Sequence, residues 1–170
     1  RRRSGARRWF HGAVPRVLFA DAWGEKEIKG YRHWRWLKDH GKGEFDFREA
    51  LGDIPHERMP AFFAGGDCFL FLSLWDETFG LVVAEALACG VPVISYPVGV
   101  APLAIEDGAN GRLISTSSPE GVLVALRWFA ALSSEDRAEM SRRSRQVAED
   151  LFDPARMATA YVDLAGRVTR

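Results

Sequence analysis

Residues 68–95 constrain the possible folds of this chain more than any other segment. Residues 68–72, Cys-Phe-Leu-Phe-Leu, are an unbroken apolar run of strand length, typical of a strand covered on both faces in a parallel sheet. Residues 80–89 are rich in Ala, Val and Leu and predict a helix that Gly90 ends. Residues 91–95 predict the next strand. Strand, helix and strand in this order indicate a parallel sheet.

The alternation of strand and helix extends toward the amino terminus. Residues 17–20 are apolar and predict a strand, and residues 31–38 predict a helix with an aromatic inner face. Residues 44–51 fit either a strand or a helix. Residues 56–64 predict a short helix that begins or is interrupted near Pro60. This half of the chain therefore adds at least one strand to the sheet.

Toward the carboxyl terminus the pattern changes from alternation to helices alone. A helical turn is predicted at residues 102–105 and a strand at residues 112–114. Helices are then predicted at residues 119–131, from Ser133 to residue 151, and at residues 154–168. The whole pattern predicts the α/β class, with a Rossmann-like parallel sheet and helices on both faces.

The charge of the chain is balanced overall but unevenly distributed. Lys plus Arg and Asp plus Glu both total 23, which gives no net charge to attract nucleic acid. Five arginines lie within the first eight residues, so the rest of the chain carries five net negative charges. We predict a poorly ordered basic arm over residues 1–15, with contact to a membrane left open, and one domain over residues 16–170.

The sequence lacks the signals that are typical of membrane-spanning proteins and of zinc-binding proteins. Neither long apolar stretch reaches the ~20 uninterrupted residues that a membrane helix needs, and we expect no signal peptide. Cys68 and Cys89 lie in apolar runs, without histidines at zinc-ligand spacing. They are expected to be free thiols, which favours a cytoplasmic location.

The loop after residue 72 carries the chemistry that the sequence makes visible. Parallel sheets of this kind place ligands at the carboxyl ends of their strands, here after Ala20, Leu72 and Ser95. Gly80, at the start of a helix whose amides point toward that edge, allows a diphosphate to approach. Glu77, just before the helix, can accept hydrogen bonds from two sugar hydroxyls. Such a site would bind a nucleotide sugar.

Two acidic side chains in this segment also have simpler interpretations. Glu77 before a helix is more often a cap or a partner of the helix dipole. Glu85, two turns into the helix, could bind the hydroxyls of a ribose or lie on an exposed stripe. The residues alone leave both alternatives open.

The segment as a whole resembles a family signature. Residues 77–93, Glu-Thr-Phe-Gly-Leu-Val-Val-Ala-Glu-Ala-Leu-Ala-Cys-Gly-Val-Pro-Val, are similar to the motif of group 1 (family 4) glycosyltransferases, in which two glutamates have seven residues between them. The likeness extends from about residue 17 to about residue 161. It implies the carboxyl-terminal donor-binding domain of a GT-B fold. It also implies a retaining transfer of a sugar from a nucleotide diphosphate to an acceptor, with no metal or other cofactor.

The resemblance assigns roles to particular residues. It gives Glu77 contact with the transferred sugar and Glu85 the ribose, while Gly52 and Ile54 match the loop that frames the base. The residues expected around the diphosphate are Thr78, Phe79, Gly80 and Leu81. Lys29 matches the basic residue that neutralises the leaving diphosphate, with Lys26 as a second choice.

The chain departs from the family pattern in three ways. Asp21 stands where an arginine is expected, and an acid there would repel the donor, although Arg58 or Arg112 could replace that arginine in space. Residues 38–54 have room for one short strand where the family has a strand, a helix and a strand. The amino-terminal acceptor half is absent. The alternatives to an enzyme are therefore a non-catalytic nucleotide-sugar-binding or partner-interaction module, or a truncated gene product.

The last predicted helix offers a surface for a partner. In the family the closing helix packs on the amino-terminal half, so the apolar face formed by Met157, Ala160, Tyr161 and Leu164 is expected to meet a separate amino-terminal domain or a dimer partner. The four histidines do not match the histidine of the family's amino-terminal half. They are expected to be surface or core residues with no catalytic role.

Overall fold

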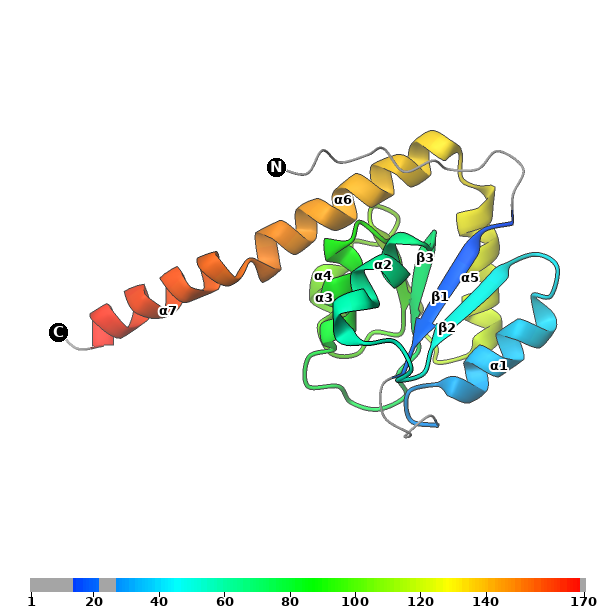
Figure 1. The fold of residues 1–170 in the computed structure, drawn as a ribbon, viewed down its shortest axis with the longest axis horizontal. Helices are drawn as coiled ribbons and strands as arrows, with labels where there is room; N and C mark the ends of the chain where they lie inside the picture. Colours follow the sequence, from blue (N-terminus) through cyan, green and yellow to red (C-terminus); the bar gives the residue numbers. More distant parts are fainter. Residues whose placement is uncertain (1–13, 22–26, 169–170) are drawn as a thin grey trace.

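The computed structural model describes residues 14–21 and 27–168 and contains a five-stranded parallel sheet (Figure 1). Its strands are β1 (Arg16–Ala20), β2 (Asp46–Ala50), β3 (Cys68–Phe71), β4 (Val93–Ser95) and β5 (Gly111–Leu113). Their order across the sheet is β2-β1-β3-β4-β5, and every pairing is parallel. The predicted α/β class with a Rossmann-like parallel sheet is confirmed.

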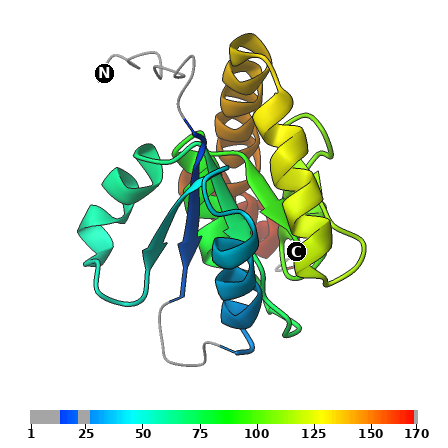
Figure 2. The same ribbon diagram turned by 90° about the vertical axis from the view of Figure 1, so that its right-hand side faces the viewer.

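Helices cover both faces of this sheet, as predicted (Figures 1 and 2). One face carries α1 (Tyr31–His40) and α5 (Pro119–Ala131). The other carries α2 (Met59–Ala64), α3 (Leu81–Ala88), α4 (Ala101–Ala104) and α6 (Ser134–Phe152). The remaining elements are the 3₁₀ helix η1 (His56–Arg58) and α7 (Pro154–Val168).

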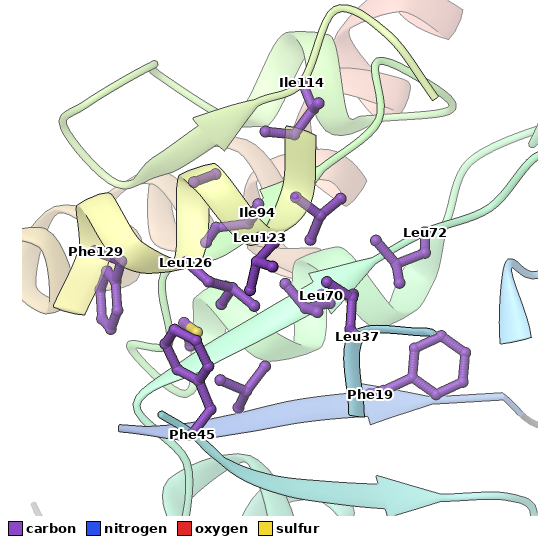
Figure 3. Close-up of a cluster of buried hydrophobic side chains, with 14 of the residues drawn as sticks. Phe19, Leu37, Phe45, Leu70, Leu72, Ile94, Ile114, Leu123, Leu126 and Phe129 are labelled. Atoms are coloured by element: carbon purple, nitrogen blue, oxygen red, sulfur yellow. The ribbon is translucent and has the colours of Figure 1, made fainter. Parts of the chain in front are cut away.

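The two faces have separate cores because side chains alternate along each strand. In β3, Cys68 and Leu70 face α1 and α5, whereas Phe69 and Phe71 face α3. Figure 3 shows the first of these cores, where Phe19, Leu70 and Ile94 from three strands meet leucines of α1 and α5. Cys68, Phe69 and Leu70 are completely buried, which is why this strand is an unbroken apolar run in the sequence.

The strand order places a ligand cleft between β1 and β3. From β1 the chain crosses to β2 on one side, and from β2 it returns to β3 on the other side of β1. The connections after β1 and β3 therefore diverge to opposite faces and open a crevice at the carboxyl edge. Asp21, directly after β1, and residues 72–80, directly after β3, leave the sheet there.

Four sequence predictions are refined by the structure. The ambiguous residues 44–51 contain strand β2, which pairs with β1 along its whole length. The helix predicted over residues 80–89 begins at Leu81, because Gly80 adopts a left-handed conformation with φ 86° that a helix cannot contain. The strand predicted over residues 91–95 is shorter, Val93–Ser95, and β5 begins one residue early, at Gly111.

The two ends of the chain differ, because the structure describes the last helix but not residues 1–13. The predicted basic arm lies outside the described residues except at Val14 and Pro15. At the other end, α7 continues beyond the body of the domain from the end of α6 (Figure 1), and none of its residues is buried. Within the described ranges, no helix is long and apolar enough to cross a membrane.

Candidate functional site

A cleft of about 600 Å³ opens at the carboxyl edge of the sheet, between the loops that follow β1, β2 and β3. Every site residue predicted from the sequence lines it: Lys29, Gly52, Ile54, Glu77, Thr78, Phe79, Gly80, Leu81 and Glu85. These residues come from three separate segments of the chain. The structure therefore brings the predicted set together, at the position where sheets of this topology bind ligands.

Glu77 has the less exposed side chain of the two predicted glutamates. Its side chain is 13% exposed and forms an ion pair with Lys29. The hydroxyl of Ser73 donates a hydrogen bond to Glu77 Oε1 at 2.8 Å. Two donors thus hold one carboxylate oxygen, and they fix the direction of the side chain at the floor of the cleft.

Lys29 is held in place through its backbone. The amide of Leu74 donates a hydrogen bond to the carbonyl of Ile28 at 2.7 Å, which joins the loop after β1 to the loop after β3. Gly30 follows with φ 81°, and a Cβ there would lie 2.1 Å from the carbonyl oxygen of Leu72. A glycine is needed at this position for both reasons, and its close approach to the end of β3 brings Lys29 beside Glu77.

The segment between Glu77 and α3 is also fixed by close backbone contacts. Gly80 has φ 86°, and a Cβ on it would lie 2.9 Å from the ring of Phe71. The amide of Val100 donates a hydrogen bond to the carbonyl of Phe79 at 2.6 Å. Leu81 and Val82, in the first turn of α3, line the cleft. The positive end of the helix dipole therefore faces the space where an anion can bind.

Glu85 lies at the other end of the cleft, beside the loop after β2. Its side chain is 37% exposed, and its Oε1 is 4.0 Å from Nδ1 of His56. Gly52 and Ile54 line the same end, together with Met59. The order along the cleft, from Lys29 and Glu77 to Glu85, follows the direction of α3.

The residues of the cleft wall that the sequence did not predict include His56 and Met59. His56 was expected to lie on the surface or in the core without a role in the site. Its side chain is 85% exposed, but it lies at the cleft. The available signal was its position two residues after Ile54, since a residue so close to the loop of Gly52 and Ile54 shares its edge of the sheet.

The cleft carries more acidic than basic groups. Asp21 lines it and is 5% exposed, so the acid that replaces the expected arginine lies inside the site. Of the residues that the structure describes, Lys29 is the one lysine or arginine in the cleft wall. Three carboxylates, on Asp21, Glu77 and Glu85, line the same cleft as that one lysine.

The basic residues considered as replacements for the arginine do not line the cleft. The guanidinium of Arg112 lies 4.4 Å from the ring centroid of Trp128, against α5. Arg58 is exposed on η1 and is absent from the described cleft wall. Lys26, the second choice for the basic residue, lies outside the described residues.

A buried polar pair connects α1 to the sheet near the cleft. His33 Nδ1 and the hydroxyl of Tyr96 are 2.8 Å apart, and both residues are buried. Burial lowers the pKa of His33, with a smaller contribution from the nearby charge of Arg32. Burial also raises the pKa of Tyr96. Both side chains are therefore neutral near pH 7 and anchor the helix that follows Lys29 and Gly30.

The arrangement suits an elongated, polar, anionic ligand. The two ends of the cleft carry carboxylates that accept hydrogen bonds from hydroxyl groups. Lys29, beside Glu77, and the start of α3 attract negative charge. Within the described part of the chain, no group of three or more His, Cys, Asp and Glu side chains is arranged to hold a metal ion.

The fold and the cleft define a class: a Rossmann-like α/β domain with a ligand site at the switch point of its sheet. Residues 48–147 match the family described as "Glycosyl transferases group 1". Since this match covers more than half of the chain, including β3 to β5 and most of the cleft, the chain belongs to that family. The predicted resemblance is confirmed.

Curated relatives support the same membership. The chain is 40% identical over 89 residues to a D-inositol 3-phosphate glycosyltransferase of Saccharomonospora viridis, an overlap of 52% of this chain and 20% of the relative. It is 29% identical over 151 residues to spore coat protein SA of Bacillus subtilis, an overlap of 87% of this chain and 39% of the relative. The chain therefore spans less than half the length of either relative.

Solved structures share the fold at lower sequence identity. Sucrose-phosphate synthase from Thermosynechococcus elongatus aligns with a TM-score of 0.71 at 19% identity, covering 92% of this chain and 46% of that one. HepE from Anabaena, in complex with UDP and glucose, aligns with a TM-score of 0.67 at 19% identity, covering 89% of this chain and 40% of that one. The described domain thus has the fold of one half of a GT-B glycosyltransferase.

Proposed function

We propose that this domain binds the donor of a retaining, family 4-like glycosyltransferase reaction, in which a sugar passes from a nucleotide diphosphate to an acceptor. The observation that carries the proposal is the convergence of the predicted residues on one cleft, although they come from segments on three different loops. The predicted residues were chosen from a sequence motif and not from their positions in space. Their presence in one cleft therefore supports that cleft as the donor site.

The chemistry of the cleft supports a particular orientation of the donor. Glu85 and the loop of Gly52 and Ile54 would hold the nucleoside, and Glu77 would accept hydrogen bonds from the sugar. Lys29, which pairs with Glu77, and the first turn of α3 would stabilise the charge that develops on the leaving diphosphate. Because these groups supply positive charge without a metal ion, we propose a site that needs no metal or other cofactor.

Lys29 and Glu77 would change partners when the donor binds. In the structure they pair with each other. A diphosphate beside Lys29 would attract its ammonium group, and the sugar hydroxyls would replace that group at Glu77. The ion pair thus keeps both side chains near their proposed positions while the cleft is empty of donor.

Asp21 favours a second candidate, a non-catalytic nucleotide-sugar-binding or partner-interaction module. Its carboxylate lies in the cleft wall where the family places an arginine. This exchange removes a bidentate phosphate ligand and adds repulsion toward a diphosphate. Such a site could keep nucleoside recognition and lose the ability to stabilise the leaving group.

Transfer would require a second domain to hold the acceptor. The chain spans less than half of its relatives, and α7 exposes Met157, Tyr161 and Leu164. We propose that this helix meets an amino-terminal acceptor domain or a dimer partner. The free thiols of Cys68 and Cys89 support a reducing, cytoplasmic environment.

The test is thermal unfolding of the purified protein with uridine, guanosine and adenosine diphosphate sugars. A donor at about a hundred times its dissociation constant stabilises the folded state by about 2.7 kcal/mol, a rise in Tm of about 5–10 °C for this size. We expect one nucleotide to give this shift and Glu85→Ala to abolish it.

The matched control is Glu44→Ala. Glu44 is a comparably exposed glutamate at the opposite edge of the sheet, where it pairs with Arg127, so this variant should keep the full shift. A cooperative unfolding transition that no nucleotide sugar moves would contradict both donor-binding functions. A shift without sugar transfer, measured with the acceptor-binding half present, would favour the non-catalytic module.

A further inference from the structure

His56 is the titratable side chain of the cleft that the proposed function does not use. It begins η1, directly after the loop of Gly52 and Ile54, and lines the nucleoside end of the cleft. Its neighbour across the cleft is Glu85, whose Oε1 is 4.0 Å from His56 Nδ1. The two residues come from different elements, η1 and α3, so their proximity is a product of the fold.

The distance between these two atoms is too long for a direct hydrogen bond and suits a bridging group. Hydrogen bonds of this kind have heavy-atom distances of about 2.8–3.0 Å. An oxygen atom placed about 2.8 Å from Glu85 Oε1 and about 2.9 Å from His56 Nδ1 would make an angle of about 90° between them. That angle is about 20° smaller than the tetrahedral angle at a hydroxyl oxygen, a deviation that the broad angular distribution of hydrogen bonds allows.

The two side chains offer the complementary functions that one hydroxyl needs. The carboxylate of Glu85 accepts a hydrogen bond, and the imidazole of His56 donates one when Nδ1 carries the proton. A hydroxyl can donate to the first and accept from the second at the same time. A plain surface ion pair would contribute little to stability and would make no distinction between ligands.

We propose that His56 and Glu85 together bind one ribose hydroxyl of the nucleotide, so that His56 determines the preference for ribonucleotides over deoxyribonucleotides. This inference rests on the proposed function, because it places the nucleoside at the Glu85 end of the cleft. The proposed ribose site then has two residues: Glu85 on α3, and His56, which follows β2 and determines specificity.

The experiment is isothermal titration calorimetry of the protein with uridine, guanosine and adenosine diphosphates and with their 2′-deoxy and 3′-deoxy forms. For the base that binds, we expect the ribonucleotide to bind at least tenfold more tightly than one of the two deoxy forms. In His56→Ala that preference should fall below threefold, because one of the two partners of the hydroxyl is lost.

Two further variants separate the hydrogen bond from other effects of the ring. His56→Phe keeps an aromatic ring at the cleft but lacks the nitrogen, and it should lose the preference as His56→Ala does. Glu57→Gln changes the adjacent residue of η1, which does not line the described cleft, and it should keep the preference. Both positions are exposed, so neither change should affect folding.

The outcomes distinguish this inference from the proposed function. Binding that depends on Glu85, with a ribose preference that His56→Ala leaves within twofold of the original value, would overturn the role of His56 alone. Equal affinities of the unmodified protein for the ribonucleotide and both deoxy forms would also overturn it. The absence of binding by all three diphosphates would overturn the proposed function, and this inference with it.

Discussion

Two glycines position residues of the proposed site, because each has a backbone conformation that residues with a Cβ rarely adopt. Gly30 and Gly80 both have positive φ, and both lie against a neighbour that leaves no room for a Cβ. Each precedes a helix and follows a residue of the cleft. Because the backbone is fixed at these two points, Lys29 and Phe79 have little freedom to move away from the cleft.

Replacing Gly30 by alanine should destabilise the protein more than the same change at Gly43. Both glycines have φ above 80°, but a Cβ at Gly30 would lie 2.1 Å from a carbonyl oxygen, whereas Gly43 has no atom of the described residues within 4 Å. We expect a loss of about 1 kcal/mol for Gly43→Ala and about 3 kcal/mol for Gly30→Ala. Urea unfolding measures both values, and equal losses would contradict the argument from close contact.

Replacing Lys29 by methionine should weaken the binding of diphosphates selectively. A charge-assisted hydrogen bond is worth about 1.5–3 kcal/mol, which corresponds to about a tenfold to hundredfold loss of affinity for uridine diphosphate if uridine is the preferred base. Uridine monophosphate, which lacks the second phosphate, should lose less than threefold in titration calorimetry.

Lys38→Met is the matched control for this change. Lys38 is paired with Glu49 and has nearly the same exposure as Lys29, 33% against 35%, but it lies outside the cleft wall. Its replacement should leave both affinities unchanged. Equal losses for the monophosphate and the diphosphate in Lys29→Met would place Lys29 away from the second phosphate.

At the scale of elements, α1 is fixed to the sheet by polar contacts as well as by its apolar face. Trp34 and Leu37 are completely buried against β1 and α5. Trp34 also donates a hydrogen bond to Glu49 of β2, and His33 bonds to Tyr96 after β4. These contacts position the amino end of α1, and with it the loop that carries Lys29.

The buried pair of His33 and Tyr96 predicts a pH dependence of stability. The pKa of His33 is lowered in the folded state from its ordinary value of 6.5, so the unfolded chain takes up a proton first as the pH falls. The free energy of unfolding should therefore decrease from about pH 6.5 downward, until the folded pKa is passed. Urea unfolding between pH 7.5 and 5 measures this decrease.

His33→Gln should flatten that pH profile. The carboxylates of Glu44, Asp46 and Glu106 have a lowered pKa because of hydrogen bonds from arginine side chains, so their contribution is lost only at a more acidic pH, below their ordinary values. A profile between pH 7.5 and 5 that is identical in His33→Gln would show that another group causes the decrease.

On the scale of the whole molecule, the chain consists of a packed domain and an extension. The sheet and the helices α1 to α6 enclose two apolar cores. In contrast, α7 has no buried residue and exposes Met157, Tyr161, Val162 and Leu164. An amphipathic helix gains its stability mainly by packing its apolar face, and the described domain leaves that face of α7 exposed.

Removing residues 154–170 should leave the stability of the domain nearly unchanged. Because no side chain of α7 is buried, the free energy of unfolding should change by less than about 0.5 kcal/mol. Leu87→Ala is the positive control, since Leu87 is fully buried in α3 and its loss should cost about 2–5 kcal/mol. A loss above 1 kcal/mol on truncation would show that α7 packs on the domain in solution.

Much of the fold could be predicted from the sequence because its signals are local. The apolar run of residues 68–72, the glycine after residues 80–89 and the prolines at 119 and 154 indicate elements without reference to distant residues. Residues 44–51 were ambiguous because their identity as a strand depends on pairing with β1. The left-handed conformation of Gly80 delays the start of α3. It goes with a close contact to Phe71, at the end of β3.

The sequence by itself determined the α/β class, the family and the residues of the proposed site, because these depend on the order of residues along the chain. Only the tertiary structure decided how these residues meet. It pairs Lys29 with Glu77, places Asp21 rather than Arg58 or Arg112 in the cleft wall, and brings His56 to Glu85. In each case the residues follow different strands that end at the same edge of the sheet. The number of residues between them in the sequence does not reveal how close they are in space.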